Sequence, residues 1–554
     1  MERFFRLGAR LRDSYQQDPW LWWIICGAFL LRIVGICYGL PLTVVADEPP
    51  FVLGALQMLQ LHTLIPAFHL AVFKKILYYP PYLSYLYLIP FTIIIGGAAL
   101  LWHVPTALLE ARLLADLSPF FLVARVGSVL LGTLSVYFVY RIAQSLFTSR
   151  TAAAASAFLL ATSVLHESLS MVGRHWMPVS FFFLLVFYLM TREWLPRNRR
   201  ILYSCTAVGA GVGISTIVIF ATLPILFWFV FESDWRLRDL VRDRLVWAGA
   251  ITLAVLAPLP TLLYPNSNNY LFGALFLSGK TMVAVLLSPL AALATQASIE
   301  PVLIGLFGIG LALLWRDQRR HAFFLGGFFL TYVVLFYFLT HIQPRFVLPL
   351  VPIYALAGGY AVSVFARQKL GLWVAILLLC LPLAISLRVA TLAVENDTRA
   401  QARTWLLHTL TPTDKVIVYA RLTRLPTTPS AVAELRALDP GAVRQVDSAD
   451  STLGRTSPYA LNLHAFSNDA FFATLPAYAA THHYTYLLYE PGIEMTPAQR
   501  AGFATLIKTA TPVATWQGFG SAFSIADSNF RVPLSDLLSH AALGPTVVVY
   551  HLAQ

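Results

Sequence analysis

Apolar runs of about 20 residues recur through the first 390 residues, and they constrain the fold more than any other feature. A run of this length can cross a bilayer as one helix. The longest runs are Trp20–Leu42, Val123–Phe147, Ile201–Phe231, Leu245–Leu263, Ala322–Thr340, Phe346–Phe365 and Leu370–Ala390. Charged residues make up 12% of the 554 residues, whereas a soluble domain carries about 25%. The sequence therefore predicts a mainly α-helical, polytopic membrane protein and excludes soluble, disordered and collagen-like classes.

Arginine-rich loops separate these runs and predict how the chain is oriented. Three of them are Glu193–Arg200, Glu232–Arg244 and Arg316–Arg320. Cytoplasmic loops carry an excess of Lys and Arg, so we expect these loops and the N-terminus in the cytoplasm. Ile201–Phe231 begins and ends beside such loops and must cross twice. About eleven crossings of the cell membrane follow, and the net charge of +12 is explained without a nucleic-acid partner.

Two further apolar segments do not fit this alternation. A single crossing by Tyr82–Trp102 would turn every later Arg-rich loop outward, and Thr281–Ala294 raises the same conflict. Segments that do not span can lie at membrane depth only where protein or water covers them. We therefore expect juxtamembrane or re-entrant helices, or a second crossing beside each.

The composition changes at about Leu392, where Arg, Asp, Thr and Ser return and the apolar runs shorten. We expect a membrane domain over residues 1–391 and an extracytoplasmic α/β domain over residues 392–554. Asp397–Leu410 reads as an amphipathic helix with Ala402, Trp405, Leu406 and Leu410 on one face. Lys415–Ala420, Tyr484–Tyr489 and Thr546–Leu552 read as strands.

Charged residues at the predicted outer face are the candidates for chemistry. Asp47 and Glu48 directly follow the first apolar run; they could cap a helix, or one could act as a general base. Arg32 lies within the first run, where a charge is functional, paired or snorkelling. Lys74 and Lys75 in the same loop could meet a phosphate or the headgroups of membrane lipids.

Two later outer loops carry more polar groups. One contains His166, Glu167, Arg174 and His175, which could hold a divalent metal ion, although their spacing matches no standard site. The other contains His341 and Arg345; an interfacial Arg can bind a phosphate bidentately or anchor to headgroups. Nearly all these groups fall on one membrane face.

The order of several motifs resembles one enzyme family. The acidic pair follows the first helix, and Tyr79-Pro80-Pro81-Tyr82 ends the first outer loop. Arg125-Val126-Gly127-Ser128, Pro344–Pro352 and Asp397-Thr398-Arg399 follow in that order. This resembles the GT-C glycosyltransferases of the dolichyl-phosphate-mannose protein mannosyltransferase kind (glycosyltransferase family 39) and bacterial relatives that transfer aminoarabinose to lipid A.

The resemblance implies a polyprenyl-phosphate-linked sugar as the donor and an acceptor that is a glycan, lipid or protein. It assigns Asp47 as the catalytic base with Glu48 beside it, and Arg345 as a contact to the donor phosphate. Members often carry an acid directly after the Arg that corresponds to Arg174. Here His175 follows, which leaves His175 or Glu167 as substitutes for a second carboxylate. No cofactor is firmly implied, and a divalent metal ion stays possible.

Two other classes of function compete with this hypothesis. The first is a transporter or flippase for lipid-linked sugars. Discontinuous helices, charges at the bilayer midplane and an inverted repeat would favour it, but the sequence shows no inverted repeat and few midplane charges. A receptor or scaffold would use the outer domain as its binding module and would give the acidic pair no role.

Overall fold

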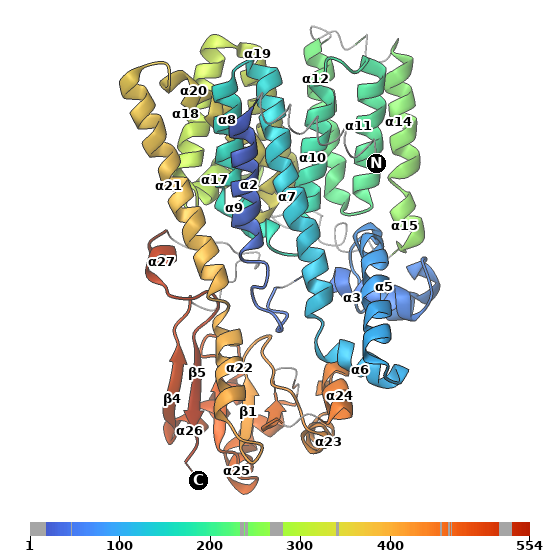
Figure 1. The fold of residues 1–554 in the computed structure, drawn as a ribbon, viewed down its shortest axis with the longest axis vertical. Helices are drawn as coiled ribbons and strands as arrows, with labels where there is room; N and C mark the ends of the chain where they lie inside the picture. The colour runs from blue at the N-terminus through green and yellow to red at the C-terminus, as the bar shows by residue number, and fades with distance from the viewer. Residues whose placement is uncertain are drawn as a thin grey trace.

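A bundle of long helices carries a smaller α/β domain at one end (Figure 1). The structure, a computed structural model, describes residues 18–553 except 46, 233–237, 239–241, 266–280, 340–342, 455–456, 464–465, 467 and 520–533. Its mainly helical architecture with a small C-terminal sheet confirms the predicted fold class.

The helices before residue 395 make up the bundle and the layer beneath it. The first ten are α2 (Pro19–Ile33), α3 (Pro49–Gln60), α4 (Leu70–Phe73), α5 (Tyr82–Trp102), α6 (Thr106–Ala115), α7 (Ser118–Phe147), α8 (Arg150–Ala161), α9 (Val164–Ser170), α10 (Trp176–Met190) and α11 (Arg197–Val212). There follow α12 (Thr222–Glu232), α14 (Arg244–Leu256), α15 (Leu259–Leu263), α17 (Met282–Ala297), α18 (Pro301–Asp317), α19 (Arg319–Leu339), the 3-10 helix η4 (Pro344–Leu350), α20 (Val351–Phe365) and α21 (Lys369–Val394).

Six helices of the described residues are long and apolar enough to cross a membrane, and the pair α8 and α9, bent by 58°, would make seven. Four shorter apolar helices accompany them. Ile201–Phe231 forms two helices, α11 and α12, with a break between them, as predicted. The number of crossings stays a prediction.

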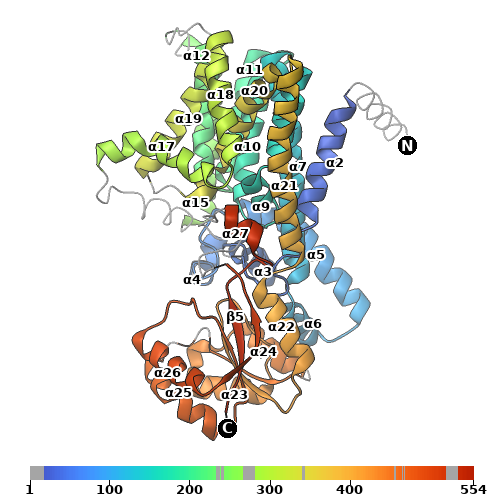
Figure 2. The same cartoon turned by 90° about the vertical axis from the view of Figure 1, so that its left-hand side faces the viewer.

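The Arg-rich connections gather at one end of the bundle. The loops between α10 and α11, between α18 and α19, and between α20 and α21 all lie at the end opposite the C-terminal domain (Figures 1 and 2). The alternation expected from the loop charges therefore matches the direction in which the helices run.

The first helix is shorter than its apolar run. α2 ends at Ile33, and the rest of the run, to Leu42, forms turns. The carbonyl oxygens of Ile36 and Tyr38 in these turns accept hydrogen bonds from Arg125. Apolar composition cannot distinguish a helix from turns whose carbonyl groups find such a partner.

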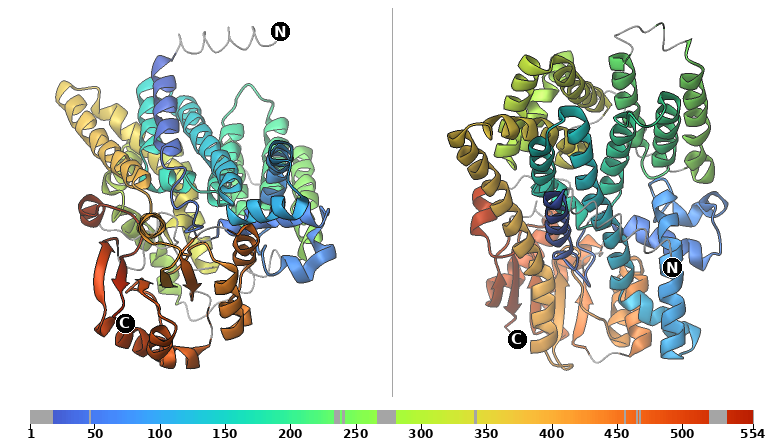
Figure 3. Two further views of the ribbon diagram at one scale, coloured as in Figure 1. Left: turned by 60° about the horizontal axis from the view of Figure 1, so that its bottom comes forward. Right: turned by 45° about the horizontal axis from the view of Figure 1, so that its top comes forward.

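Helices α3 to α6 form a layer between the bundle and the C-terminal domain (Figures 1 and 3). α5, which covers the whole of Tyr82–Trp102, lies in this layer rather than among the bundle helices. Several of its apolar side chains are exposed, among them Leu86, Ile89, Ile93 and Leu101. α17 lies across the bundle direction in Figure 2.

The C-terminal domain is a sheet covered by helices on both faces. Its elements are α22 (Thr398–Thr409), β1 (Lys415–Tyr419), α23 (Pro429–Leu438), α24 (Gln445–Leu453), β2 (Tyr459–Asn462), α25 (Asp469–Thr481), β3 (Tyr486–Tyr489), α26 (Pro497–Lys508), β4 (Thr511–Trp516), α27 (Leu534–Ser539) and β5 (Val547–His551). The strand order is β2-β1-β3-β5-β4. β1 pairs in parallel with β2 and β3, whereas β5 runs antiparallel to β3 and β4.

Strand side chains alternate between two cores. Val416 and Val418 pack with Leu406 of α22 on one face, and Ile417 packs with Phe472 and Phe503 on the other. α22 corresponds to the predicted amphipathic helix, with Ala402, Leu406 and Leu410 buried. The domain follows α21, which ends at Val394, and the boundary at Leu392 stays a prediction.

Candidate active site

The acidic pair lies between the turns after α2 and the start of α3, and its two side chains have different surroundings. Asp47 adopts a left-handed backbone conformation with φ of 60°, and Glu48 precedes the two prolines that begin α3. The Asp47 side chain is 23% exposed, whereas that of Glu48 is fully buried. Only Asp47 is therefore open to an arriving substrate.

Glu48 is held by a bidentate ion pair. Nε and Nη2 of Arg125 donate to its two carboxylate oxygens at 2.8 Å each, and both side chains are fully buried. The Gly173 N–H donates to Glu48 Oε1 at 2.6 Å. A Cβ at Gly173 would lie 2.7 Å from the Ala124 side chain, so the close approach requires glycine. Glu48 therefore joins α7 to the loop that precedes α10.

Asp47 accepts two hydrogen bonds from residues far apart in the chain. Tyr78 Oη donates to Oδ1 at 2.7 Å, and Arg174 Nη2 donates to Oδ2 at 2.5 Å. Burial and the neighbouring Asp47 raise the pKa of Tyr78 well above its usual value, so the phenol keeps its proton and acts as a donor. Arg174 is 1% exposed, which makes it a buried cation facing a partly exposed carboxylate.

Aromatic rings form one wall beside this pair. Tyr79 lies with its ring centroid 4.9 Å from that of Phe51 and 4.4 Å from that of His175. Burial, with the positive charges of Arg174 and Arg345, lowers the pKa of His175 well below its usual value. His175 is therefore a neutral imidazole in the positive field of Arg174 and Arg345.

Arg345 reaches the same region from η4. Its guanidinium carbon lies 5.0 Å from the ring centroid of Phe346, and Phe346 in turn contacts Trp176 at a centroid distance of 5.1 Å. Five of the residues singled out from the sequence thus converge, namely Asp47, Tyr79, Arg174, His175 and Arg345.

Arg32, His166 and Glu167 form a separate buried group. Arg32 donates to the carbonyl oxygens of Leu160 and Ala161 and contacts His166 Nδ1 at 2.9 Å. The last carbonyl groups of a helix lack partners within it, so Arg32 satisfies the end of α8 where the chain bends into α9. Glu167 accepts a hydrogen bond from Ser386 of α21.

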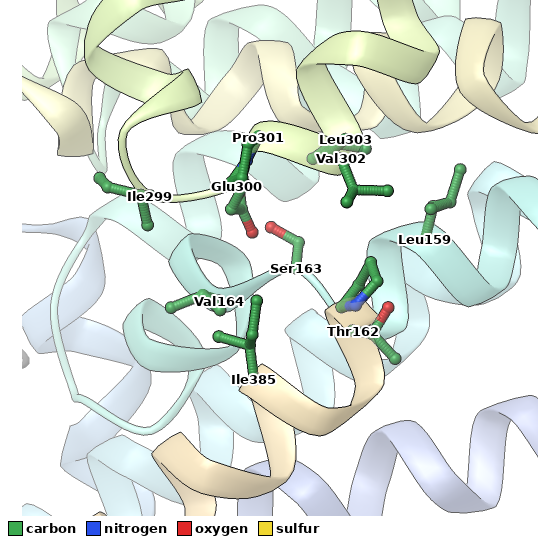
Figure 4. A pocket seen from close by; sticks show the side chains of 11 residues that line it. Leu159, Thr162, Ser163, Val164, Ile299, Glu300, Pro301, Val302, Leu303 and Ile385 are labelled. Carbon is green, nitrogen blue, oxygen red and sulfur yellow. The ribbon is translucent and has the colours of Figure 1, made fainter. Parts of the chain in front are cut away.

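A small cavity lies at the same bend (Figure 4). It measures about 20 Å³, which is room for about one water molecule. Ser163 and Glu300 point toward one another in it, and Glu300 also accepts a hydrogen bond from Gln296. These contacts stabilise the bent pair of helices and leave no room for a sugar.

The remaining candidates lie elsewhere. Lys74 and Lys75 are exposed after α4, and His341 falls outside the described residues. No three His, Cys, Asp or Glu side chains in the described parts of the chain come together as a metal site. A divalent ion therefore stays a prediction without a defined set of ligands.

The C-terminal domain holds the loop that carries the acidic pair. Asp397 Oδ2 accepts a hydrogen bond from Tyr38 Oη at 2.7 Å, and Arg399 pairs bidentately with Asp397 at 2.7 and 2.9 Å. Asn396 Oδ1 accepts from the Gly39 N–H at 2.6 Å. The carbonyl group of Tyr38 also bonds Arg125, so a continuous set of contacts runs from Arg399 to Glu48.

Sequence reasoning did not single out Arg125, Tyr38 and Tyr78 as parts of the site. A usable signal existed for Arg125, which is a charge inside an apolar run and is expected to have a buried partner. Tyr38 and Tyr78 carry no comparable signal, because single tyrosines at a membrane interface are ordinary.

Part of the membrane region matches a known protein family. Residues 103–264 match the family model described as dolichyl-phosphate-mannose-protein mannosyltransferase. This match confirms the resemblance to family 39 glycosyltransferases of the GT-C type. It includes Arg125 and Arg174 but neither Asp47 nor Arg345. A search of curated proteins finds no match.

Solved structures of glycosyltransferases are also similar. ArnT from Cupriavidus metallidurans bound to undecaprenyl phosphate has a TM-score of 0.49 and 13% identity, covering 97% of this chain and 99% of that one. The Archaeoglobus fulgidus oligosaccharyltransferase in complex with Zn and sulfate has a TM-score of 0.45 and 13% identity, covering 85% and 68%. The mycobacterial arabinofuranosyltransferase AftD has a TM-score of 0.36 and 14% identity, covering 78% and 34%.

Proposed function

We propose that this chain is an inverting membrane glycosyltransferase that moves a sugar from a polyprenyl-phosphate donor to an acceptor hydroxyl, with Asp47 as the general base. The observation that carries the proposal is a partly exposed carboxylate paired with the buried guanidinium group of Arg174, in a chain of which residues 103–264 match a glycosyltransferase family. The description of that family names a polyprenyl-phosphate-linked mannose, which supports the class of donor.

The chemistry is a single displacement. The acceptor oxygen attacks the anomeric carbon while its proton passes to an Asp47 oxygen, and the bond from that carbon to the phosphate oxygen breaks. The leaving polyprenyl phosphate takes the electron pair and gains one negative charge, and the proton later leaves Asp47 for water. Phosphate leaves readily, so no general acid is needed, and one displacement inverts the anomeric centre.

Arg174 could link donor binding to the release of Asp47 from its ion pair. Its guanidinium group pairs with Asp47 in the structure, and a donor phosphate would compete for the same N–H groups because charge-assisted bonds to phosphate are strong. Movement of Arg174 to the phosphate would free Asp47 Oδ2 for the acceptor hydroxyl. The same cation would then stabilise the charge that develops on the leaving group.

Glu48 acts as a positioning residue in this scheme. Both of its oxygens accept hydrogen bonds from Arg125, and Oε1 also accepts the Gly173 N–H. In this scheme the buried Glu48 fixes the loop that carries Arg174 and does not receive the proton. Arg32 is likewise committed to the carbonyl groups of α8. Arg345 is the better candidate for a second contact to the donor phosphate.

Replacing Arg345 with Ala should weaken binding of undecaprenyl phosphate to the purified protein about 10- to 150-fold. A hydrogen bond to a charged group contributes roughly 1.5–3 kcal/mol, and 1.4 kcal/mol is about a tenfold change. Binding is measured by titration in detergent. Arg319→Ala, which removes an exposed cation at the opposite end of the bundle, is the control. Unchanged affinity in Arg345→Ala would remove Arg345 from the phosphate site.

The C-terminal domain should lie outside the cytoplasm, with the N-terminus inside. The Arg-rich loops lie at the opposite end of the bundle (Figure 1), and such loops favour the cytoplasm. Alkaline phosphatase fused after Gln554 should therefore be active, whereas fusion after Arg199 should be inactive. The reverse pattern would place the Asp47 face in the cytoplasm and overturn the topology.

The test of the proposed function is transfer by the purified protein. The full chain in nanodiscs, given tritium-labelled polyprenyl-phosphate-mannose and a cell-envelope extract, should release polyprenyl phosphate and label an acceptor. A flippase would move the lipid between leaflets and label no acceptor. If neither labelled product nor released carrier appears with mannose- or pentose-linked donors, the glycosyltransferase proposal fails.

A further inference from the structure

An open groove lies in the C-terminal domain between α22 and the end of the edge strand β4. It is a wide, open depression of about 420 Å³. Its lining residues are Asn396, Ala400, Gln401, Thr404, Trp405 and Trp516. The first five come from the start of α22 and the residues before it, and Trp516 is the last residue of β4.

Two indole rings form the apolar part of this groove. The ring centroids of Trp405 and Trp516 lie 5.9 Å apart with an interplanar angle of 68°. Both side chains are half-buried, and both pack against the sheet core that contains Leu406 and Val547. The core therefore fixes the two rings in place while part of each lines the groove.

Neutral polar groups form the rest of the lining. Asn396 Oδ1 accepts hydrogen bonds from two backbone N–H groups, Gln401 Nε2 donates to two carbonyl oxygens, and the Thr404 hydroxyl donates to the Ala400 carbonyl oxygen. The Asn396 amide can still donate to a ligand, and the Gln401 amide and the Thr404 hydroxyl can still accept. None of the six lining residues is charged. This combination suits a ligand with apolar faces and many hydroxyl groups at its edges, which describes a sugar ring. It suits an anion poorly, because no cation lines the groove.

The groove shares a residue with the loop of the candidate active site. Asn396 Oδ1 accepts the Gly39 N–H at 2.6 Å, and the chain runs from Gly39 to Asp47 in eight residues. Gln401 Nε2 donates to the carbonyl oxygen of Glu395 at 2.7 Å, which fixes its amide beside that of Asn396. A chain held in the groove is thereby held next to the segment that leads to the base.

We propose that this groove binds a neutral glycan, and that this glycan is the acceptor chain to which the sugar is added. The second part rests on the proposed function, and the first part does not. A peptide acceptor would instead pair with the free edge of β4. That edge carries Pro512 and a break in register between Pro512 and Ala514, and proline removes a backbone donor from a strand.

The experiment measures glycan binding directly by saturation-transfer NMR. The full-length protein is placed in lipid nanodiscs, because maltoside detergents would present sugars of their own. Mannohexaose, maltohexaose and chitohexaose are the probes. At least one should bind, and Trp516→Ala should weaken its binding about 3- to 10-fold, the range expected for losing one aromatic contact.

Two further variants keep the test decisive. Thr404→Arg fills the groove from an exposed position of α22 and should abolish binding even if Trp516→Ala destabilises the domain. Trp194→Ala removes a tryptophan that is 73% exposed outside the groove and should leave binding unchanged. Absence of binding by all three probes, or equal binding by Thr404→Arg and the wild type, would overturn the proposal.

Comparing glycan binding with sugar transfer tests the glycan site and the proposed glycosyltransferase reaction separately. Asp47 does not line the groove, so Asp47→Asn should bind the oligosaccharide as the wild type does. Binding without any sugar transfer by the wild type would refute the reaction and leave the glycan site standing. Transfer onto an acceptor that the Thr404→Arg variant modifies normally would refute the groove and leave the reaction standing.

Discussion

Replacing Asp47 with Asn should lower the rate of sugar transfer at least ~100-fold, since general-base catalysis typically contributes about 10²- to 10⁴-fold. The amide keeps the size of the side chain and can still accept the hydrogen bond from Tyr78. It cannot take a proton from the acceptor hydroxyl. The measurement is the initial rate of transfer from the polyprenyl-phosphate donor by purified variants at saturating donor.

Two controls make this result specific to the base. Asp116→Asn removes another carboxylate of the same outer region, which bonds only the neighbouring Ser118 N–H among the described contacts, and it should retain full activity. Donor binding by Asp47→Asn should not weaken, because the charge that competes with the donor phosphate for Arg174 is removed, so the loss should appear in kcat. Near-normal turnover by Asp47→Asn together with an inactive Glu48→Gln would mean that the base was assigned to the wrong carboxylate.

Much of the membrane architecture could be predicted from loop charge. The Arg-rich loops required Ile201–Phe231 to turn back, and the structure breaks this run into α11 and α12. The same reasoning kept Tyr82–Trp102 out of the alternation; α5 lies near the C-terminal domain, but it is also long and apolar enough to cross a membrane, so this part stays a prediction. Charge at the loops is informative because moving it across a bilayer is costly.

Local irregularities were less accessible from the sequence. The sequence predicted β1, β3 and β5 as strands, but it predicted neither the short strand β2 nor β4, which contains Pro512 and a bulge. The end of the first apolar run became turns because Arg125, nearly 90 residues away, bonds their carbonyl groups. Patterns within a segment cannot reveal a partner supplied by a distant one.

The candidate active site could likewise be predicted only in part from the sequence. The clustering of polar groups on one face predicted a common region, and Asp47, Arg174, His175 and Arg345 do converge. What the sequence could not separate was function from pairing. Glu48 was a second candidate carboxylate beside Asp47 and Arg32 a candidate contact to phosphate, yet each is committed to buried partners. Burial and bond count, which depend on the tertiary structure, make that distinction.

Replacing Glu48 with Gln should destabilise the protein by about 3–5 kcal/mol, which is the usual cost of removing one member of a buried ion pair. Arg125 would keep its positive charge at a fully buried position with only a neutral amide beside it. The loop with Arg174 would also lose a strong acceptor at the Gly173 N–H. We expect a lower thermal unfolding midpoint in nanodiscs, followed by intrinsic fluorescence.

The double variant Glu48→Gln/Arg125→Gln distinguishes an electrostatic cause from a loss of packing. Removing both charges ends the desolvation penalty, so the midpoint should recover in part. The carbonyl groups of Ile36 and Tyr38 would still lack the donor that Arg125 provides. Because an unsatisfied buried polar group costs about 1–3 kcal/mol, the recovery should be incomplete. Arg316→Gln is the matched control, because the arginine side of its pair with Asp317 is 67% exposed, and an exposed pair contributes little to stability. If the double variant is as unstable as the sum of the two single variants, the ion pair is not what holds this loop, and the positioning role of Glu48 is wrong.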